Sequence, residues 1–172
     1  MLFRSEKGLP TLLEAFARIR RPGFHLVIIG SGQLLPSLQR QREALGLGDC
    51  CHFVPTTADV PGWLHSLDIF VLPSLSEALS NSLMEAMACG LAVVASDIGG
   101  NPELALHGEN GLLFPVGDSA ALASCLEKLA GDPDLRRKFG TAASGFIHGK
   151  FSVSAAGSRM GAIYEQFLTN RS

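Results

Sequence analysis

The sequence lacks any long uninterrupted apolar run. Apolar residues make up 47% of its 172 residues, but Glu85 interrupts the longest apolar region, residues 83–95. A transmembrane helix needs about 20 consecutive, mostly apolar residues, so we expect no membrane-spanning segment. The first ten residues carry Arg4, Glu6 and Lys7 and no apolar core, so they do not resemble a secretory signal peptide.

A surplus of basic residues is also missing. Fourteen lysines and arginines stand against sixteen acidic residues, which gives a net charge of −2. A chain without a basic surplus is a poor candidate for binding nucleic acid or an anionic membrane, so we expect no nucleic-acid partner. With only 17% charged residues the chain is too apolar for a disordered tail, and its length is enough for one domain with a real core.

Cysteine pairs and histidine clusters are scarce as well. The four cysteines form no CxxC motif, and no histidine lies three or four residues from another. We therefore expect reduced thiols in a cytoplasmic protein, and no metal site. The motifs GxSxG and GxxxxGK[ST] are absent, so the sequence gives no support to a nucleophilic serine or a P-loop.

Short apolar segments do alternate regularly with helical patterns along the whole chain. Strands are predicted at 25–30, 51–54, 69–72, 91–95 and 112–116. Helices are predicted at 9–19, 34–45, 60–66, 81–89, 101–106, 119–130, 133–147 and 153–168. Continuously apolar strands belong in a parallel sheet that is covered on both faces. The pattern predicts a single domain over 1–172, an α/β fold with a doubly wound, Rossmann-like parallel sheet and flanking helices.

Ligands of such folds bind where the strands end and the next helices begin. Gly30-Ser31-Gly32 follows the first strand, and its glycines let a backbone approach an anion. Position 35 is leucine, so the third glycine of GxGxxG is missing. A tight strand-to-helix turn explains these residues at least as well as a phosphate loop does.

The stretch after Pro73 is the most informative one. Glu77 lies in a loop, Ser80 to Ser82 offer N-caps for the next helix, and Glu85 lies about one turn into that helix. Carboxylates accept hydrogen bonds from sugar hydroxyls and a helix N-terminus binds phosphate, so a polyol phosphate fits these groups around one crevice. The alternative is that Glu77 is a solvated loop acid and Glu85 only complements the helix dipole. Lys7, before the first helix, adds a cation near another helix start.

Together these residues resemble the family 4 retaining glycosyltransferases of the GT-B fold. The resemblance rests on the spacing of Glu77 and Glu85, the string EAMACG at 85–90, the Lys7-Gly8 entry to the first helix and the Gly99-Gly100 pair. It covers almost the whole chain. It implies the C-terminal, donor-binding half of such an enzyme, whose substrate is a nucleoside diphosphate sugar of the UDP or GDP type, with no cofactor and no metal.

The resemblance also implies roles for individual residues. The catalytic residues would be Lys7, contacting the donor diphosphate, and Glu77, facing the transferred sugar. Glu85 would hydrogen-bond the ribose hydroxyls, and Glu103 would have a structural role. The full set that binds the nucleotide sugar would be Gly30, Ser31, Gly32, Ala78, Leu79, Ser80, Asn81 and Glu85.

The chain departs from the family pattern at its beginning and at Ala78, where glycine is usual. The family's arginine before the lysine falls at Met1 or Leu2, with Arg4 as a poorly spaced substitute. The strand that precedes this lysine is absent or reduced to Leu2-Phe3. Because that strand is central in the family's sheet, its loss predicts unpaired backbone groups and an apolar slot.

The family's N-terminal acceptor domain is missing too. We therefore expect a fragment that is inactive alone, with an N-terminal domain or separate subunit as partner and peripheral membrane association only through that half. The last helix would expose Val153, Met160, Ile163, Phe167 and Leu168 as an association surface. The alternatives are a non-catalytic fragment that binds a nucleotide or a partner, and an epimerase or phosphorylase of the same architecture.

Overall fold

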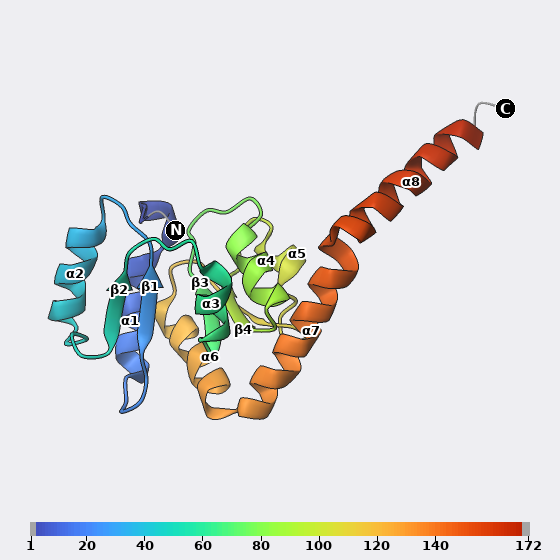
Figure 1. The fold of residues 1–172 in the computed structure, drawn as a ribbon. Helices are drawn as coiled ribbons and strands as arrows, with labels where there is room; N and C mark the ends of the chain where they lie inside the picture. The colour runs from blue at the N-terminus through green and yellow to red at the C-terminus, as the bar shows by residue number, and fades with distance from the viewer. Residues whose placement is uncertain (1–2, 170–172) are drawn as a thin grey trace.

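Parallel strands lie between two layers of helices in the computed structural model, which describes residues 3–169 except for the side chains at 153, 156, 159, 162, 165 and 167–169 of the last helix (Figure 1). The strands are β1 (Leu26–Ile29), β2 (Cys51–Val54), β3 (Ile69–Leu72), β4 (Ala92–Ser96) and β5 (Leu112–Phe114). The helices are α1 (Leu9–Ile19), α2 (Leu35–Ala44), α3 (Val60–His65), α4 (Asn81–Ala88), α5 (Asn101–Leu104), α6 (Ser119–Gly131), α7 (Pro133–Phe151) and α8 (Val153–Thr169). The predicted order of strands and helices is confirmed, and α7 runs four residues further than expected.

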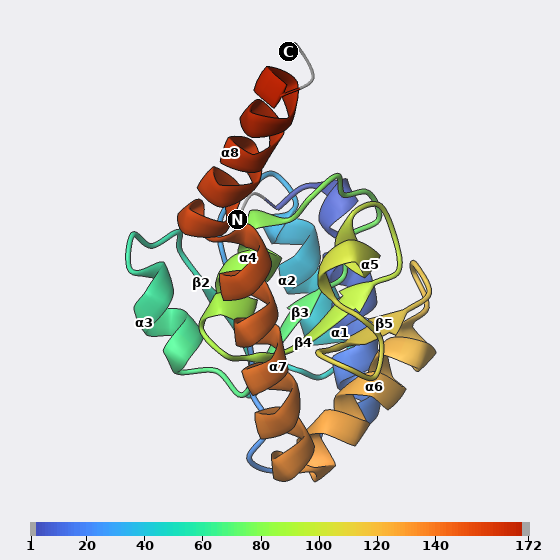
Figure 2. The same cartoon turned by 90° about the vertical axis from the view of Figure 1, so that its right-hand side faces the viewer.

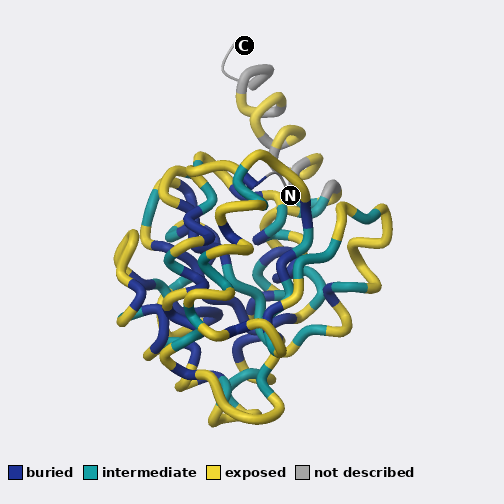
Figure 3. The backbone as a smooth tube through the Cα atoms, turned by 90° about the vertical axis from the view of Figure 1, so that its left-hand side faces the viewer, coloured by how far each residue is buried: buried dark blue, intermediate teal, exposed yellow. Residues whose placement is uncertain are grey.

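β4 shows why the strands are continuously apolar. All five of its residues are buried. Ala92 and Val94 face one core cluster, while Val93 and Ala95 face the other. Side chains alternate across a strand, so a strand covered on both faces is apolar at every position. Figure 3 shows the result as a buried interior within an exposed outer shell.

The strands form two sheets. β1 pairs with β2, and β3, β4 and β5 form the second sheet in that order, with every pairing parallel. Within residues 3–169 no strand lies between β1 and β3. The expected single sheet is therefore divided at the place where the central strand was predicted to be lacking.

Helices cover both faces of these sheets. On one face α1 packs against α6 and α2, and on the other α4 packs against α7 (Figure 2). Leu9, Leu12, Leu13, Phe16 and Ile19 are the buried large side chains of α1, as its spacing predicted. Caps fix the ends locally, since the Asp118 carboxylate accepts hydrogen bonds from the first N–H groups of α6, both at 2.9 Å.

α8 projects away from the rest of the domain (Figure 1). Met160, Ile163 and Tyr164 are 54%, 47% and 64% exposed, which confirms the expected apolar exposure for Met160 and Ile163. Val153, Phe167 and Leu168 lie outside the described side chains. None of the helices in the described part of the chain is long and apolar enough to cross a membrane.

Candidate functional site

The first described residues lie across the carboxyl ends of the two sheets. The Phe3 N–H donates to the Ser31 carbonyl at 2.7 Å, just after β1, and the Leu75 N–H donates to the Glu6 carbonyl at 2.7 Å, just after β3. These bonds hold a single 3₁₀ turn, Ser5–Lys7, above the gap between the sheets. The carboxyl ends of both sheets therefore border one site.

Gly8 positions Lys7 against β3. Its φ of +59° is left-handed, and a Cβ at this position would lie 1.9 Å from the Pro73 carbonyl oxygen. Only glycine fits such a close backbone approach in that conformation. The Lys7-Gly8 pair noted in the sequence is thus a turn that places the lysine beside the loop after β3.

Lys7 and Glu77 form an ion pair across 70 residues of sequence. The Lys7 Nζ atom lies 2.8 Å from Glu77 Oε2, and the two side chains are 27% and 15% exposed. The Ser74 hydroxyl donates to the same oxygen at 3.2 Å. Two of the predicted functional residues are thereby brought together, half-buried, at the end of β3.

The loop that carries Glu77 rests on the segment after β4. The Ser96 hydroxyl donates to the Ser74 carbonyl at 2.6 Å, and the Gly100 N–H donates to the Ala78 carbonyl at 2.8 Å. A Cβ on Gly99, whose φ is +55°, would lie 1.6 Å from the Glu77 carbonyl oxygen. The sequence did not predict this contact between the two loops. The Gly99-Gly100 pair after a predicted strand could have indicated it, because adjacent glycines allow a close backbone approach.

The same loop leads into the N-terminus of α4. Ser80 is the N-cap, because its buried hydroxyl accepts a hydrogen bond from the Leu83 N–H at 3.3 Å. Asn81 and Ser82 follow in the first turn, whose N–H groups have no acceptor within the helix. The predicted binding residues Ala78, Leu79 and Asn81 are exposed here. This end of α4 can therefore present amides to an anion.

A cavity of about 430 Å³ opens beside the N-terminal turn. Its lining consists of Phe3, Arg4, Ser5, Glu6, Gly32, Gln33 and Leu34. Of the predicted glycine loop, Gly32 lines this cavity and Ser31 is exposed, whereas Gly30 is buried. A hydrogen bond from its own backbone, aided by Ser5 and the charges of Arg4 and Lys7, lowers the pKa of the Glu6 carboxyl. The cavity is thus lined by a cation and an anion.

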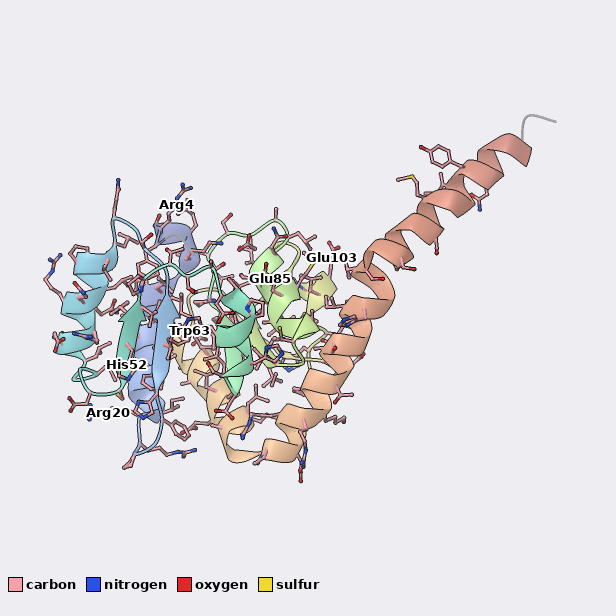
Figure 4. All side chains as sticks on the ribbon, in the orientation of Figure 1. Arg4, Arg20, His52, Trp63, Glu85 and Glu103 are labelled. Atoms are coloured by element: carbon pink, nitrogen blue, oxygen red, sulfur yellow. The ribbon has the colours of Figure 1, made fainter. Side chains whose placement is uncertain are left out.

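Figure 4 places Arg4, Glu85 and Glu103 toward the end of the molecule where the strands finish, while Arg20 and His52 lie at the other end. Glu85 is exposed on α4, and neither it nor Glu77 lines the cavity. Their sharing one crevice stays a prediction. The predicted residues nevertheless gather at one end, as the rule for parallel sheets requires.

This layered fold, with its site at the carboxyl ends of parallel strands, belongs to the GT-B class. The family model "Glycosyl transferases group 1" matches residues 1–132. The chain therefore belongs to the group 1 glycosyltransferase family, which confirms the resemblance stated from the sequence.

Two curated relatives from rhizobia show the extent of the match. The lipopolysaccharide core biosynthesis glycosyltransferase LpsE of Rhizobium meliloti is 32% identical over 153 residues, which cover 89% of this chain and 44% of LpsE. The lipopolysaccharide core biosynthesis mannosyltransferase LpcC of Rhizobium leguminosarum bv. viciae is 35% identical, over 98% of this chain and 50% of LpcC. The chain thus spans about half the length of these relatives.

Solved structures of glycosyltransferases also superpose on this chain. Anabaena Alr3699/HepE in complex with UDP superposes with a TM-score of 0.90 at 26% identity, over 96% of this chain and 47% of that one. The C-terminal domain of a group 1 family glycosyltransferase (LpcC) from Francisella tularensis superposes with a TM-score of 0.81 at 29% identity, over 88% of this chain and 83% of that domain.

Proposed function

We propose that this chain is the donor-binding domain of a retaining glycosyltransferase. It holds a nucleoside diphosphate sugar, and the complete enzyme transfers the hexose to an acceptor hydroxyl. The observation that carries the proposal is the half-buried pair of Lys7 and Glu77 beside the N-terminus of α4. One cation, one carboxylate and a row of amides match the diphosphate and the hydroxyls of such a donor.

The diphosphate would lie between Lys7 and the start of α4. When the bond from the anomeric carbon to the diphosphate oxygen breaks, the electron pair moves onto that oxygen. The ammonium of Lys7 and the N–H groups after Ser80 stabilise this growing negative charge. Groups fixed in place before the reaction do this at little reorganisation cost, which is how enzymes commonly stabilise a developing anion.

The sugar would lie against Glu77. The contacts from Lys7 and Ser74 both use Oε2, so Oε1 is the oxygen that would accept hydrogen bonds from sugar hydroxyls. The loop that carries Glu77 packs tightly against Gly99, and this packing fixes the position of the Glu77 carboxylate. Glu77 is therefore the group that would orient the transferred hexose.

The nucleotide would extend toward the cavity lined by Arg4 and Gly32. Glu85, exposed one turn into α4, would accept hydrogen bonds from the ribose hydroxyls. The similar Anabaena structure is a complex with UDP, which supports a nucleotide ligand, and we propose a uridine or guanosine diphosphate donor here. The acceptor would be bound by an N-terminal domain or a separate subunit, so we expect no sugar transfer by these 172 residues alone.

Thermal unfolding in the presence of UDP, GDP or ADP tests the proposal. A ligand at 100 times its Kd adds about 2.7 kcal/mol, which for a domain of this size raises Tm by about 5–10 °C. We expect such a rise with one nucleotide and a weaker one after Glu85→Ala. The matched control is Glu127→Ala, an exposed glutamate on α6 far from the site in sequence. A Tm indifferent to all three nucleotides refutes donor binding, and equal affinities of the two variants refute the ribose role.

A further inference from the structure

Asn101 is a fully buried polar residue at the start of α5, with 0% of its surface exposed. Its side-chain amide donates to the Ser96 carbonyl at 3.0 Å and to the Ser96 hydroxyl at 3.4 Å. Its Oδ1 atom is buried without a hydrogen-bond partner in the described part of the chain. A buried unpaired oxygen costs stability, which an apolar side chain of the same shape would avoid. Stability alone therefore does not explain an amide at this position.

Asn101 closes the turn that follows β4. The Ser96 carbonyl accepts from the Ile98 N–H at 2.9 Å as well as from the Asn101 side chain. The Asn101 N–H in turn donates to the Ile98 carbonyl at 3.1 Å. Gly100 lies within this turn, and its N–H donates at 2.8 Å to a carbonyl of the loop that carries Glu77. The turn closed by Asn101 therefore supports that loop on one side.

The Ser96 hydroxyl continues the chain of hydrogen bonds. A serine hydroxyl has one proton to donate and can accept at its lone pairs. Because the Asn101 amide donates to this oxygen, the hydroxyl proton is directed to the Ser74 carbonyl, which lies 2.6 Å away. Ser74 and Ser96 are also 0% exposed, so water does not compete for these bonds. Asn101 and Ser96 thus hold the segment that follows β3.

One peptide unit links these bonds to the Lys7–Glu77 pair. The Ser74 carbonyl accepts the bond from the end of β4, and the N–H of the same planar unit, on Leu75, donates to the Glu6 carbonyl at 2.7 Å. Bonds on both sides therefore fix the plane of this peptide. Glu6 precedes Lys7 in the 3₁₀ turn. The Ser74 hydroxyl donates to Glu77 Oε2 at 3.2 Å, so the positions of both members of the ion pair depend on this peptide.

We propose that Asn101 and Ser96 are positioning residues, which hold the Glu77 carboxylate where it meets the sugar of the donor. The inference rests on the proposed function, in which Glu77 orients the hexose. Both side chains are too buried to touch a ligand, and neither residue lines the cavity proposed for the nucleotide. They therefore act on the affinity for the sugar and leave the affinity for the nucleotide unchanged.

Calorimetry of two variants tests this division. Asn101→Leu removes the amide but keeps the shape, and the Ser96 carbonyl keeps its bond from Ile98. Ser96→Ala removes the hydroxyl. The ligands are UDP with UDP-glucose and GDP with GDP-mannose. For the pair that the wild-type chain binds, we expect both variants to weaken binding of the nucleotide sugar by about 3- to 10-fold, and binding of the nucleotide by less than about twofold.

The matched control is Asn110→Leu. Asn110 is also a buried asparagine, and its side chain bonds to backbone groups at the end of α5. This variant loses buried hydrogen bonds without touching the turn that Asn101 closes. We therefore expect it to lower the free energy of unfolding and to change neither affinity.

The coupling between Lys7 and Glu77 tests the same role without a ligand. The double-mutant cycle with Lys7→Met and Glu77→Gln is measured by urea unfolding in the wild-type chain and in the Asn101→Leu background. We expect the coupling, expressed as a ratio of equilibrium constants, to be smaller by a factor of about three or more in that background. A residue that only stabilises the fold would lower the stability of all four chains equally and leave the coupling unchanged.

The two experiments distinguish the positioning role from donor binding. Equal losses of nucleotide and nucleotide-sugar affinity, or an unchanged coupling, would overturn the positioning role. If the wild-type chain binds none of the four ligands, the proposed donor function fails, and the coupling alone decides whether Asn101 positions Glu77. Should Asn101→Leu not fold, Ser96→Ala takes its place in the cycle with the same expected result.

Discussion

Neutralising either member of the Lys7–Glu77 pair should destabilise the fold, and neutralising both should cost less than the sum. The variants are Lys7→Met, which keeps the apolar stem, Glu77→Gln, which keeps the shape, and the double variant. The double-mutant cycle isolates the interaction between the two side chains.

The expected coupling follows from burial. Exposed ion pairs contribute about 0.2–1 kcal/mol, because water screens them. Hydrogen bonds to charged groups contribute about 1.5–3 kcal/mol, and the pair has 2.8 Å geometry with side chains only 27% and 15% exposed. We therefore expect a coupling of about 1–2 kcal/mol, above an exposed pair and below a fully buried one.

Urea unfolding without any ligand measures this coupling, with free energies extrapolated to water. The matched control is the cycle on Arg137 and Asp134, an i,i+3 pair on α7 whose side chains are 80% and 83% exposed. That pair should couple by less than about 0.5 kcal/mol. A coupling for Lys7 and Glu77 no larger than that of the control would refute the reasoning from burial.

Three further predictions follow from single features. Lys7→Ala should lower diphosphate affinity at least several-fold more than monophosphate affinity, measured by calorimetry, and equal losses would contradict a diphosphate contact. Gly99→Ala should cost at least about 3 kcal/mol in urea unfolding, since its Cβ would lie 1.6 Å from a carbonyl oxygen. Gly108→Ala is its control, with φ of +81° but no atom within 4 Å, and should cost only about 1 kcal/mol. Burial raises the pKa of the Cys51 thiol from 9.0 to about 11, so the thiolate is favoured in the unfolded chain and folding stability should fall as pH rises from 9 to 11. At pH 8, alkylation followed by mass spectrometry should label Cys51 more slowly than Cys50, and equal rates would contradict its burial.

Most of the secondary structure could be read from the sequence. The i, i+3, i+4 spacing of Leu9, Leu12, Leu13 and Phe16 gave the bounds of α1, and the apolar runs at 51–54 and 69–72 gave β2 and β3 without error. These signals are local, because a helix face or a strand repeats within a few residues. The division of the sheet was also predictable: within residues 3–169 no strand lies between β1 and β3, and they belong to two separate sheets.

The site was predictable as a set of residues but not as an arrangement. Glycines and caps near strand ends indicated Lys7, Glu77 and Ser80. No sequence pattern predicted that Lys7 would form an ion pair with Glu77, or that Gly99 would pack closely against the Glu77 carbonyl. Nor did any pattern predict that neither Glu77 nor Glu85 would line the cavity beside Gly32.

The sequence by itself therefore determined the elements, the family and the candidate residues, because backbone propensity and side-chain periodicity act over one or two turns. The tertiary structure alone decided which of those residues meet. Lys7 meets Glu77 because parallel strands end at one edge and bring together segments 70 residues apart.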